Sequence, residues 1–497
     1  MSVGRPMVVV SLPARSLEAT RRQIDEAGIA GADMAEVRLD RWSPAERPRV
    51  GQLFPASLPL IATLRSRAEG GEGPDAAEDR AATLLTAARE PFAFVDLESG
   101  RDRRLEDPVR ELGPRVVRSA HLVPETAPME LRARVVEGGP PNGLLKIVLP
   151  ASLSRAVHEL LPLFEGTPAP HPVFLTTGPS GPLWRAWTGR LGIPWVFAAL
   201  AEEGGAGSVE PSQIPADRLE TFLSAPDAPI FAVVGHPVAH SRSPAIHHGW
   251  MRRGGHAGLY VPLDLDSPGE FRVAIEALPS RGLLGFNVTH PYKRLAYECA
   301  GERSADALAT GVANCLTFLE GRVVADNTDL GAVQRRLEEL RDQGLWSGSS
   351  LTILGGGGAA RATLVAAQRL GATATVYARR ASEVEALATE YGAEVGDPHS
   401  PSPAGLVVHA TDVGRAGRGP LELPLRPLLA PGSYLLDWVY DPEVPVLSQI
   451  ARDQGASYED GRRLLVYQAA ASFRTWWGAA PDDASIAEAL QRAGCAA

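Results

Sequence analysis

The sequence predicts an α/β protein with an N-terminal (β/α)8 barrel, then a smaller α/β domain, then a Rossmann-like domain. The first observation is that short apolar, β-rich runs alternate with helical patterns eight times in the first 200 residues. The second is a glycine-rich turn, Gly355–Ala359, between an expected strand and an expected helix. The expected domains are 1–225 for the barrel, 229–330 for the smaller α/β domain, 331–460 for the Rossmann-like domain, and 461–497 for a returning helix and tail.

The barrel is expected to contain eight strands with polar residues near their C-terminal ends, where barrels of this kind place their active sites. Glu36 and Arg38 lie late in the second strand, and His121 ends the fifth. The expected strands are Met7–Leu12, Met34–Asp40, Pro59–Arg65, Phe92–Glu98, Arg115–His121, Leu144–Pro150, Pro172–Thr177 and Pro194–Leu200. The first of these is short and is followed by no small-residue cleavage site, so we expect a strand rather than a signal peptide.

The two later domains show the same alternation of strands and helices. The glycine turn starts the doubly wound pattern, and a helix over Arg462–Trp477 is expected to return to the smaller domain. Ala479–Ala497 suits either a peripheral helix or a loose tail. The expected strands are Phe231–Gly235, Tyr260–Leu265, Leu284–Thr289, a β-rich stretch over Ala313–Asn327, and then Leu351–Leu354, Thr373–Arg379, Leu406–Thr411 and Ser433–Val439.

Composition narrows the class of protein. Hydrophobic residues make up 44% and charged residues 22%, as in ordinary globular proteins. The net charge of -10 argues against a nucleic-acid partner, and no apolar run is long enough to cross a membrane. The three cysteines have neither paired nor metal-ligand spacing, so we expect a cytoplasmic protein without disulfides or a metal. Composition carries no signal of an oligomeric state.

One lysine, Lys146, lies inside an apolar strand of the barrel. An unpaired buried ammonium is costly, so desolvation is expected to lower the pKa of Lys146 and to make a neutral amine available. Such an amine can attack a ketone and form a Schiff base, which then serves as an electron sink. His121, at the end of the preceding strand, could act as the base. The alternative is a lysine with a structural role.

A second lysine, Lys293, ends the segment Asn287-Val-Thr-His-Pro-Tyr-Lys293. Together with Asp329 and the serines Ser241 and Ser243, it predicts a polar pocket that can hold a small hydroxylated acid. The lysine can stabilise negative charge that develops on a carbonyl oxygen and help to deliver a proton. Asp329 could orient the lysine. The alternative is an ordinary surface ion pair.

The glycine turn is expected to bind a dinucleotide, because a strand precedes it and a helix follows. At the end of the next strand, where an acidic residue would favour NAD, the chain has Arg379 and Arg380. Guanidinium groups favour a 2′-phosphate and hence NADP(H). The alternatives are a plain structural turn and solvated surface arginines. The expected cofactor-binding residues of the turn are Gly355, Gly357, Gly358 and Ala359.

These motifs resemble shikimate dehydrogenase, and the resemblance runs from about residue 230 to 478. It implies that Ser241 and Ser243 hold the substrate carboxylate. It also implies that Lys293 and Asp329 are catalytic and that Thr411 lies on the cofactor side. His409 stands where the family usually has Asn before Ala-Thr, a departure that could alter contacts near the nicotinamide. The remaining substrate contacts implied by the resemblance are Asn287, Thr289, Asn314, Tyr440 and Gln468.

The first half resembles type I 3-dehydroquinate dehydratase, through the segments Glu36–Asp40, Arg65–Gly71, Ser119–His121 and Leu145–Ile147. The resemblance implies that Lys146 forms an imine with the C3 ketone, that His121 moves the C2 proton and assists loss of the C1 hydroxyl, and that Glu69 supports His121. Substrate-binding roles fall on Glu36, Arg38, Arg65, Arg185 and Gln213.

Two departures from the dehydratase pattern occur. Trp184 replaces the usual Ser before Arg185. The closing loop, Val209–Gln213, keeps Gln213 but lacks the family's serine, unless Ser208 substitutes for it.

The leading hypothesis is a bifunctional enzyme that dehydrates 3-dehydroquinate and reduces 3-dehydroshikimate to shikimate with NADPH. One alternative keeps the reductase but makes the barrel a degenerate scaffold, because of the altered loop. Another is a sensor that binds quinate-type acids without turnover, but such a protein should have lost Lys146, Lys293 or Asp329. A third is a quinate or shikimate dehydrogenase working oxidatively with NAD, for which an acidic residue at position 379 would be expected.

Overall fold

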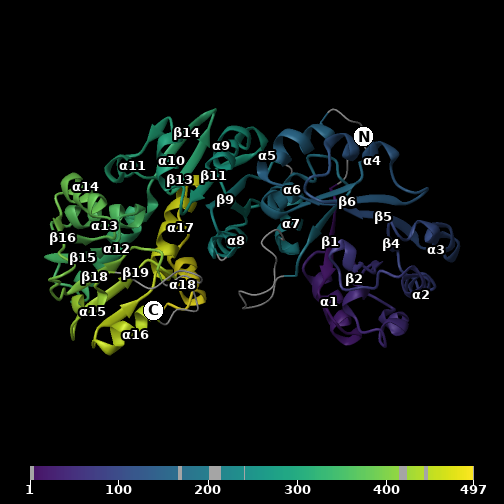
Figure 1. Ribbon diagram of the computed structural model, residues 1–497, viewed down its shortest axis with the longest axis horizontal. Coiled ribbons are helices and arrows are strands. Elements are labelled where there is room, and N and C mark those ends of the chain that lie inside the picture. Colours follow the sequence, from purple (N-terminus) through teal and green to yellow (C-terminus); the bar gives the residue numbers. More distant parts are fainter. Residues whose placement is uncertain are drawn as a thin grey trace. The chain divides into compact units, whose positions relative to one another are not determined.

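The computed structural model describes residues 5–165, 171–200, 214–225, 227–239, 241–413, 423–440 and 446–495. Contacts within the chain group it into two compact units (Figure 1). The first comprises Met1–Ile230 with Ala257–Gly282, and the second comprises Phe231–His256 with Leu283–Ala497. Gln213 and the loop Val209–Gln213, which the sequence marks as a substrate-closing segment, lie outside the described residues.

The first sheet has eight parallel strands in the order β7-β6-β5-β4-β3-β2-β1-β8, and it curves into a nearly closed barrel. This confirms the predicted (β/α)8 architecture. The strands are β1 (Met7–Leu12), β2 (Met34–Arg38), β3 (Leu60–Thr63), β4 (Phe94–Glu98), β5 (Arg115–His121), β6 (Leu144–Pro150), β7 (Val173–Thr177) and β8 (Trp195–Ala198). The helices are α1 (Leu17–Ile29), α2 (Ala77–Ala88), α3 (Glu106–Leu112), α4 (Pro128–Glu137), α5 (Leu153–Arg155), α6 (Gly181–Trp187) and α7 (Ala216–Leu223).

An apolar layer and a polar layer follow one another along the barrel strands. Met34, Ile61, Phe94 and Val117, on β2 to β5, belong to one buried hydrophobic cluster. Because side chains on a strand alternate between faces, the residues two positions later share their face. Those residues are Glu36, Thr63, Asp96 and Ser119, and all four are buried. The two-residue alternation of side chains along each strand therefore places a polar layer next to the apolar one. The polar layer is the one nearer the C-terminal ends of the strands.

The second sheet is mixed, with the order β10-β9-β11-β13-β14-β12. Its predicted β-rich stretch 313–327 forms a hairpin, in which Glu320 and Gly321 have positive φ, as two-residue hairpin turns require. The strands are β9 (Ile230–Gly235), β10 (Leu259–Asp264), β11 (Leu283–Val288), β12 (Glu302–Arg303), β13 (Cys315–Leu319) and β14 (Arg322–Asp326). The helices are α8 (Ser243–Arg253), α9 (Pro268–Ala277), α10 (Lys293–Cys299), α11 (Ala305–Thr310) and α12 (Thr328–Asp342).

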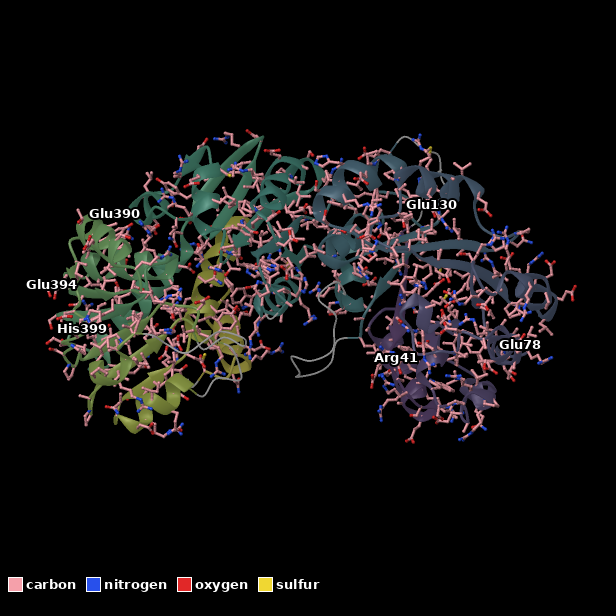
Figure 2. The ribbon with its side chains drawn as sticks, viewed as in Figure 1. Arg41, Glu78, Glu130, Glu390, Glu394 and His399 are labelled. Carbon is pink, nitrogen blue, oxygen red and sulfur yellow. The ribbon has the colours of Figure 1, made fainter. Side chains whose placement is uncertain are left out.

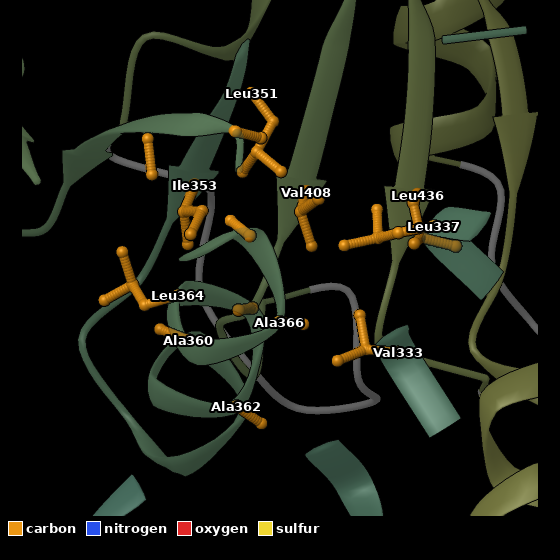
Figure 3. Packing of buried hydrophobic residues seen from close by; sticks show 14 of the residues in the cluster. Val333, Leu337, Leu351, Ile353, Ala360, Ala362, Leu364, Ala366, Val408 and Leu436 are labelled. Carbon is orange, nitrogen blue, oxygen red and sulfur yellow. The ribbon is translucent and has the colours of Figure 1, made fainter. Parts of the chain in front are cut away.

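The third sheet is parallel, with the doubly wound order β17-β16-β15-β18-β19-β20. Its core packs strand residues such as Ile353 and Val408 against Ala366 of a helix (Figure 3). The strands are β15 (Ser350–Leu354), β16 (Thr373–Tyr377), β17 (Glu394–Val395), β18 (Leu406–His409), β19 (Tyr434–Asp437) and β20 (Ser457–Glu459). The helices are α13 (Gly358–Arg369), α14 (Ala381–Tyr391), α15 (Leu425–Leu428) and α16 (Val446–Asp453).

Two helices complete the chain. Helix α17 (Arg462–Trp477) contacts α8, α12 and β11. Helix α18 (Asp483–Arg492) begins at the capping residue Asp482, whose side chain accepts a hydrogen bond from the Ser485 amide. It contacts α8, where the Trp250 indole donates to the Ser485 carbonyl oxygen over 3.2 Å. Of the two alternatives for 479–497, the structure therefore favours a peripheral helix.

Charged side chains lie at the outside of both units, as labelled for Glu78, Glu130 and Glu394 in Figure 2, and these three are exposed. Across the ranges that the structure describes, we find no helix with the length and apolarity that crossing a bilayer demands.

Candidate active sites

The buried lysine of the barrel lies between two carboxylates. Lys146 Nζ donates to Glu36 Oε1 over 2.9 Å and to Asp96 Oδ2 over 3.1 Å. It also lies 4.5 Å from the ring centroid of Phe197. Each carboxylate has a further donor, because Ser11 Oγ donates to Glu36 and Ser119 Oγ donates to Asp96. Both carboxylates therefore pair with the Lys146 ammonium, and their negative charge compensates for the cost of burying it.

This pairing corrects the expected protonation of Lys146. Burial favours the neutral amine, but Glu36 and Asp96 outweigh it, so the pKa of Lys146 is raised rather than lowered. Burial likewise opposes ionisation of Glu36, yet Lys146 and Arg38 hold the pKa of that carboxyl far below its usual range. The expectation of a neutral resting amine was wrong because it counted burial without the two carboxylates. The free enzyme carries an ammonium.

His121 and Glu69 form a second pair at the same end of the barrel. His121 Nδ1 lies 2.6 Å from Glu69 Oε2, and the His121 amide donates to the same oxygen. Burial, together with the positive charges of Arg65 and Lys146, lowers the pKa of His121 to about 3, while burial raises the pKa of Glu69. With Glu69 accepting from Nδ1–H, the neutral imidazole keeps Nε2 as a proton acceptor. The structure therefore brings together Lys146, His121, Glu69 and Glu36.

The three predicted arginines differ in how they are held. Arg38 makes a bidentate ion pair with Asp40, with both contacts at 2.8 Å. Arg65 donates from Nε to the Glu69 carbonyl oxygen, which ties it to the loop that carries Glu69. Arg185, on α6, is buried and donates to the backbone carbonyl oxygens of Thr176, Gly181 and Phe197.

Sequence reasoning missed Asp96 as a site residue. The sequence does contain a pattern that could have predicted it, because Asp96 and Glu98 occupy alternate positions in the otherwise apolar strand β4. Glu98 accepts a hydrogen bond from the Ser66 amide over 2.7 Å and so anchors the loop that leads to Glu69. Two acidic residues at period two in a buried strand place both side chains on the inner face.

The second unit contains a cavity of about 680 Å³. Its wall includes Lys293 and Asp329, together with the glycine turn. Lys293 Nζ donates to Asp329 Oδ2 over 2.5 Å, although the two residues are 36 positions apart in the chain. The Lys293 side chain is 22% exposed, so its ammonium is accessible from the cavity. The other predicted residues in the wall are Ser241, Ser243, Asn287, Thr289, Asn314, Gly357, Gly358, Ala359, Arg380, Thr411, Tyr440 and Gln468.

Amide side chains on one side of the cavity form a buried network. Asn314 Nδ2 donates to Thr328 Oγ1 over 3.0 Å, and the Thr328 amide donates to Asn314 Oδ1 over 2.7 Å. Asn287 Nδ2 donates to Ser472 Oγ over 2.7 Å. Thr328 and Ser472 were not predicted. Ser472 lies one helical turn after Gln468 on α17, and two polar residues at this spacing in a largely buried helix were its signal.

The glycine turn fits a nucleotide pyrophosphate. Gly355 has φ of +129°, and a Cβ there would lie 2.5 Å from the Ala410 carbonyl oxygen, so only glycine is tolerated. A Cβ on Gly357 would meet no atom within 4 Å, which leaves the backbone open toward the cavity. The turn leads into the N-terminus of α13, whose free N–H groups favour an anion. Gly358 lies against Lys293, since an added Cβ would come 3.0 Å from its Cδ.

The two expected phosphate-binding arginines differ in position. Both are exposed, but only Arg380 is among the cavity-lining residues in the described part of the chain. Gly355 begins the glycine turn, but Ala410 and Thr411 cover it, and it is not among the cavity-lining residues of the described chain.

Fold and sites together define the class: a lysine-bearing (β/α)8 barrel joined to a nucleotide-dependent oxidoreductase with a lysine–aspartate pair. The family model for "Type I 3-dehydroquinase" matches residues 8–228, and that for "Shikimate dehydrogenase substrate binding domain" matches residues 233–316. The chain belongs to the shikimate dehydrogenase family and carries a type I 3-dehydroquinase domain before it.

Relatives of the second half are similar over most of their own length. The chain is 38% identical to the shikimate dehydrogenase (NADP(+)) of Acidiphilium cryptum, over 52% of this chain and 94% of the relative. It is 37% identical to that of Methylobacterium radiotolerans, over 50% and 91%. Among solved structures, shikimate 5-dehydrogenase of Thermus thermophilus in complex with NADP(H) and shikimate is 32% identical (TM-score 0.48), covering 53% of this chain and 99% of that one. Dehydroquinate dehydratase and shikimate dehydrogenase from S. pombe is 21% identical (TM-score 0.43), covering 98% of each chain.

Proposed function

We propose that this chain catalyses two consecutive reactions, dehydration of 3-dehydroquinate to 3-dehydroshikimate in the barrel and NADPH-dependent reduction of 3-dehydroshikimate to shikimate at the second site. The observation that carries the proposal is the presence of two lysines, each paired with at least one carboxylate, at two separate sites. Lys146 is held between Glu36 and Asp96. Lys293 is paired with Asp329 beside the glycine turn.

In the barrel, the Lys146 amine adds to the C3 ketone and expels one water, which gives an imine. His121 Nε2 removes a proton from C2, and the electron pair moves into the imine to give an enamine. The enamine then expels the C1 hydroxyl, which takes the proton from His121 and leaves as water. Hydrolysis of the imine returns the amine and consumes one water, so the net reaction loses one water.

The resting ammonium requires a proton transfer before the first step. Glu36 and Asp96 both lie within 3.1 Å of Lys146 Nζ and are the nearest proton acceptors. When the substrate enters and excludes water, one carboxylate takes the proton and the neutral amine forms next to the ketone. We assign substrate binding to Glu36, Arg38, Arg65, Arg185 and Gln213.

At the second site, bound NADPH supplies a hydride to the substrate ketone. Lys293 stabilises the negative charge that develops on the ketone oxygen and delivers the proton, while Asp329 holds the ammonium in place. We assign the substrate carboxylate to Ser241 and Ser243. The ring hydroxyls and remaining contacts fall to Asn287, Thr289, Asn314, Tyr440 and Gln468.

NADPH is the proposed cofactor because Arg380 lines the cavity and Arg379 precedes it, and because similar proteins are described as NADP(+)-dependent. Gly355, Gly357, Gly358, Ala359 and Thr411 complete the proposed cofactor site.

The proposed domains remain 1–225, 229–330, 331–460 and 461–497. The free cysteines suit a reducing compartment, for which we propose the cytoplasm.

Trapping the imine tests the barrel reaction directly. Borohydride reduction in the presence of 3-dehydroquinate should add one ligand-sized mass to the protein, on the tryptic peptide that contains Lys146. The reductase is tested separately by following NADPH oxidation with 3-dehydroshikimate. Absence of the adduct together with normal NADPH oxidation would reduce the proposal to a reductase with an inactive barrel.

A further inference from the structure

Two buried side chains, His409 and Asp437, are linked by hydrogen bonds to Thr411, a half-buried residue of the second cavity's wall. His409 and Asp437 are register partners on the neighbouring parallel strands β18 and β19. His409 Nδ1 lies 2.7 Å from Asp437 Oδ1, and His409 Nε2 lies 2.5 Å from Thr411 Oγ1. His409 and Asp437 are both 0% exposed, so neither side chain can touch a ligand.

The direction of each hydrogen bond follows from the acceptors. A carboxylate can only accept, so His409 donates from Nδ1–H to Asp437, and a neutral imidazole then accepts at Nε2 from the Thr411 hydroxyl. Thr411 Oγ1 in turn accepts the Val413 amide over 3.2 Å. Asp437 Oδ1 also accepts the Val439 amide over 2.9 Å. The imidazole therefore links the backbone turn after β18 to the turn after β19.

Both turns form the cavity wall next to the cofactor turn. The first contributes Ala410, Thr411 and Asp412, and the second contributes Trp438, Val439 and Tyr440. A Cβ on Gly355 would lie 3.2 Å from Thr411 Cγ2, so the first turn also packs against the glycine turn. A change in either turn must alter the wall that the nucleotide meets.

We propose that His409, together with Asp437, is a positioning residue for cofactor binding, which acts by holding the two turns that follow β18 and β19 in the geometry the dinucleotide requires. The inference rests on the proposed NADPH-dependent reduction. It assigns His409, which departs from the usual Asn of the family, an indirect role in this chain.

The structure offers a matched set of variants. His409→Asn keeps an amide that can pair with Asp437 but is too short to reach Thr411 as well. His409→Phe keeps the ring volume and removes both nitrogens. Tyr458→Phe is the control. The Tyr458 hydroxyl donates to the other oxygen of the same carboxylate over 3.1 Å, and Tyr458, on β20, is not among the cavity-lining residues.

The test is fluorescence titration of the full chain with NADPH and with NADH, with kcat measured at saturating cofactor. Both His409 variants should raise the Kd for the nucleotide about fivefold to tenfold, which is the change expected from the loss of one buried hydrogen bond. The factor should be the same for NADPH and NADH, because the 2′-phosphate contacts are untouched. Tyr458→Phe should lower Tm without changing Kd.

Unchanged Kd in His409→Asn would overturn the inference, even if His409→Phe fails to fold. An equal rise in Kd for Tyr458→Phe would also overturn it, because the effect would then be a general loosening of the sheet. A wild type that binds NADPH but does not reduce 3-dehydroshikimate contradicts only the proposed function, and the comparison of Kd values still decides the role of His409. A wild type that binds neither cofactor contradicts both.

Discussion

Lys146 Nζ lies 2.9 Å from Glu36 Oε1, although the two residues are 110 positions apart. With Asp96 on its other side, the lysine rests as an ammonium inside the barrel rather than as a free amine. The same two carboxylates that raise its pKa are the groups able to take its proton. We propose that the ion cluster has two roles: it stabilises the barrel, and it supplies the carboxylate that takes the proton of Lys146 when the substrate binds.

Replacing Lys146 should separate these two roles. Lys146→Met removes the cation that both buried carboxylates contact directly, so it should lower the free energy of unfolding by about 3–5 kcal/mol and abolish dehydration. Lys146→Arg keeps the charge but cannot form the imine, so it should abolish dehydration with a smaller loss of stability. Urea unfolding and a dehydration assay measure both effects. Equal stability of the two variants would contradict the ion-cluster account.

His121 should remain neutral through the physiological range. Its pKa is lowered to about 3, so its ring signals should not titrate between about pH 5 and 8 in an NMR experiment, with His121→Asn providing the assignment. The unfolded chain binds this proton near pH 6.5, so the stability that His121 contributes is present above that pH and is lost as the pH falls toward 3. A midpoint for His121 near pH 6.5 would contradict the burial argument.

Lys293 and Asp329 should act as one unit. Lys293→Met should lower kcat for reduction about 10²-fold to 10⁴-fold, and Asp329→Asn should do so to a smaller extent. The double variant should be little worse than Lys293→Met alone, because the contact at 2.5 Å is already lost. Steady-state kinetics with 3-dehydroshikimate measure this, and dehydration in the barrel is the internal control. Additive effects would show that the two residues work independently.

Arg380 should set the preference for NADPH more strongly than Arg379, since Arg380 lines the cavity. Arg380→Glu should raise the KM for NADPH about tenfold to a hundredfold and change the KM for NADH much less, because only NADPH carries the 2′-phosphate. Arg379→Glu should have a smaller effect. A larger effect at Arg379 would reverse the assignment of the two arginines.

How well the sequence predicts an interaction depends on how far apart the two residues lie along the chain. Periodicity alone predicted β5 and β6 with their observed bounds, and adjacent strands bring His121 and Lys146 to one end of the barrel. The protonation of Lys146 was predicted wrongly because Glu36 and Asp96 lie 110 and 50 residues away, and only the barrel register reveals them.

The pairing of His409 with Asp437 was equally hidden, since it depends on the register of two parallel strands. The ion pair of Arg38 could have been predicted from the sequence, because its partner Asp40 is only two residues away. Local patterns therefore predicted which side chains share a site, whereas the charges that tune them came from distant strands.

The most direct test of the two-reaction account supplies purified protein with 3-dehydroquinate and NADPH in one cuvette, beside Lys146→Arg. Wild type should oxidise NADPH and form shikimate without any added intermediate, while the variant should do so only when given 3-dehydroshikimate. If wild type also needs added 3-dehydroshikimate, the barrel does not catalyse dehydration, and the account of Lys146 is contradicted.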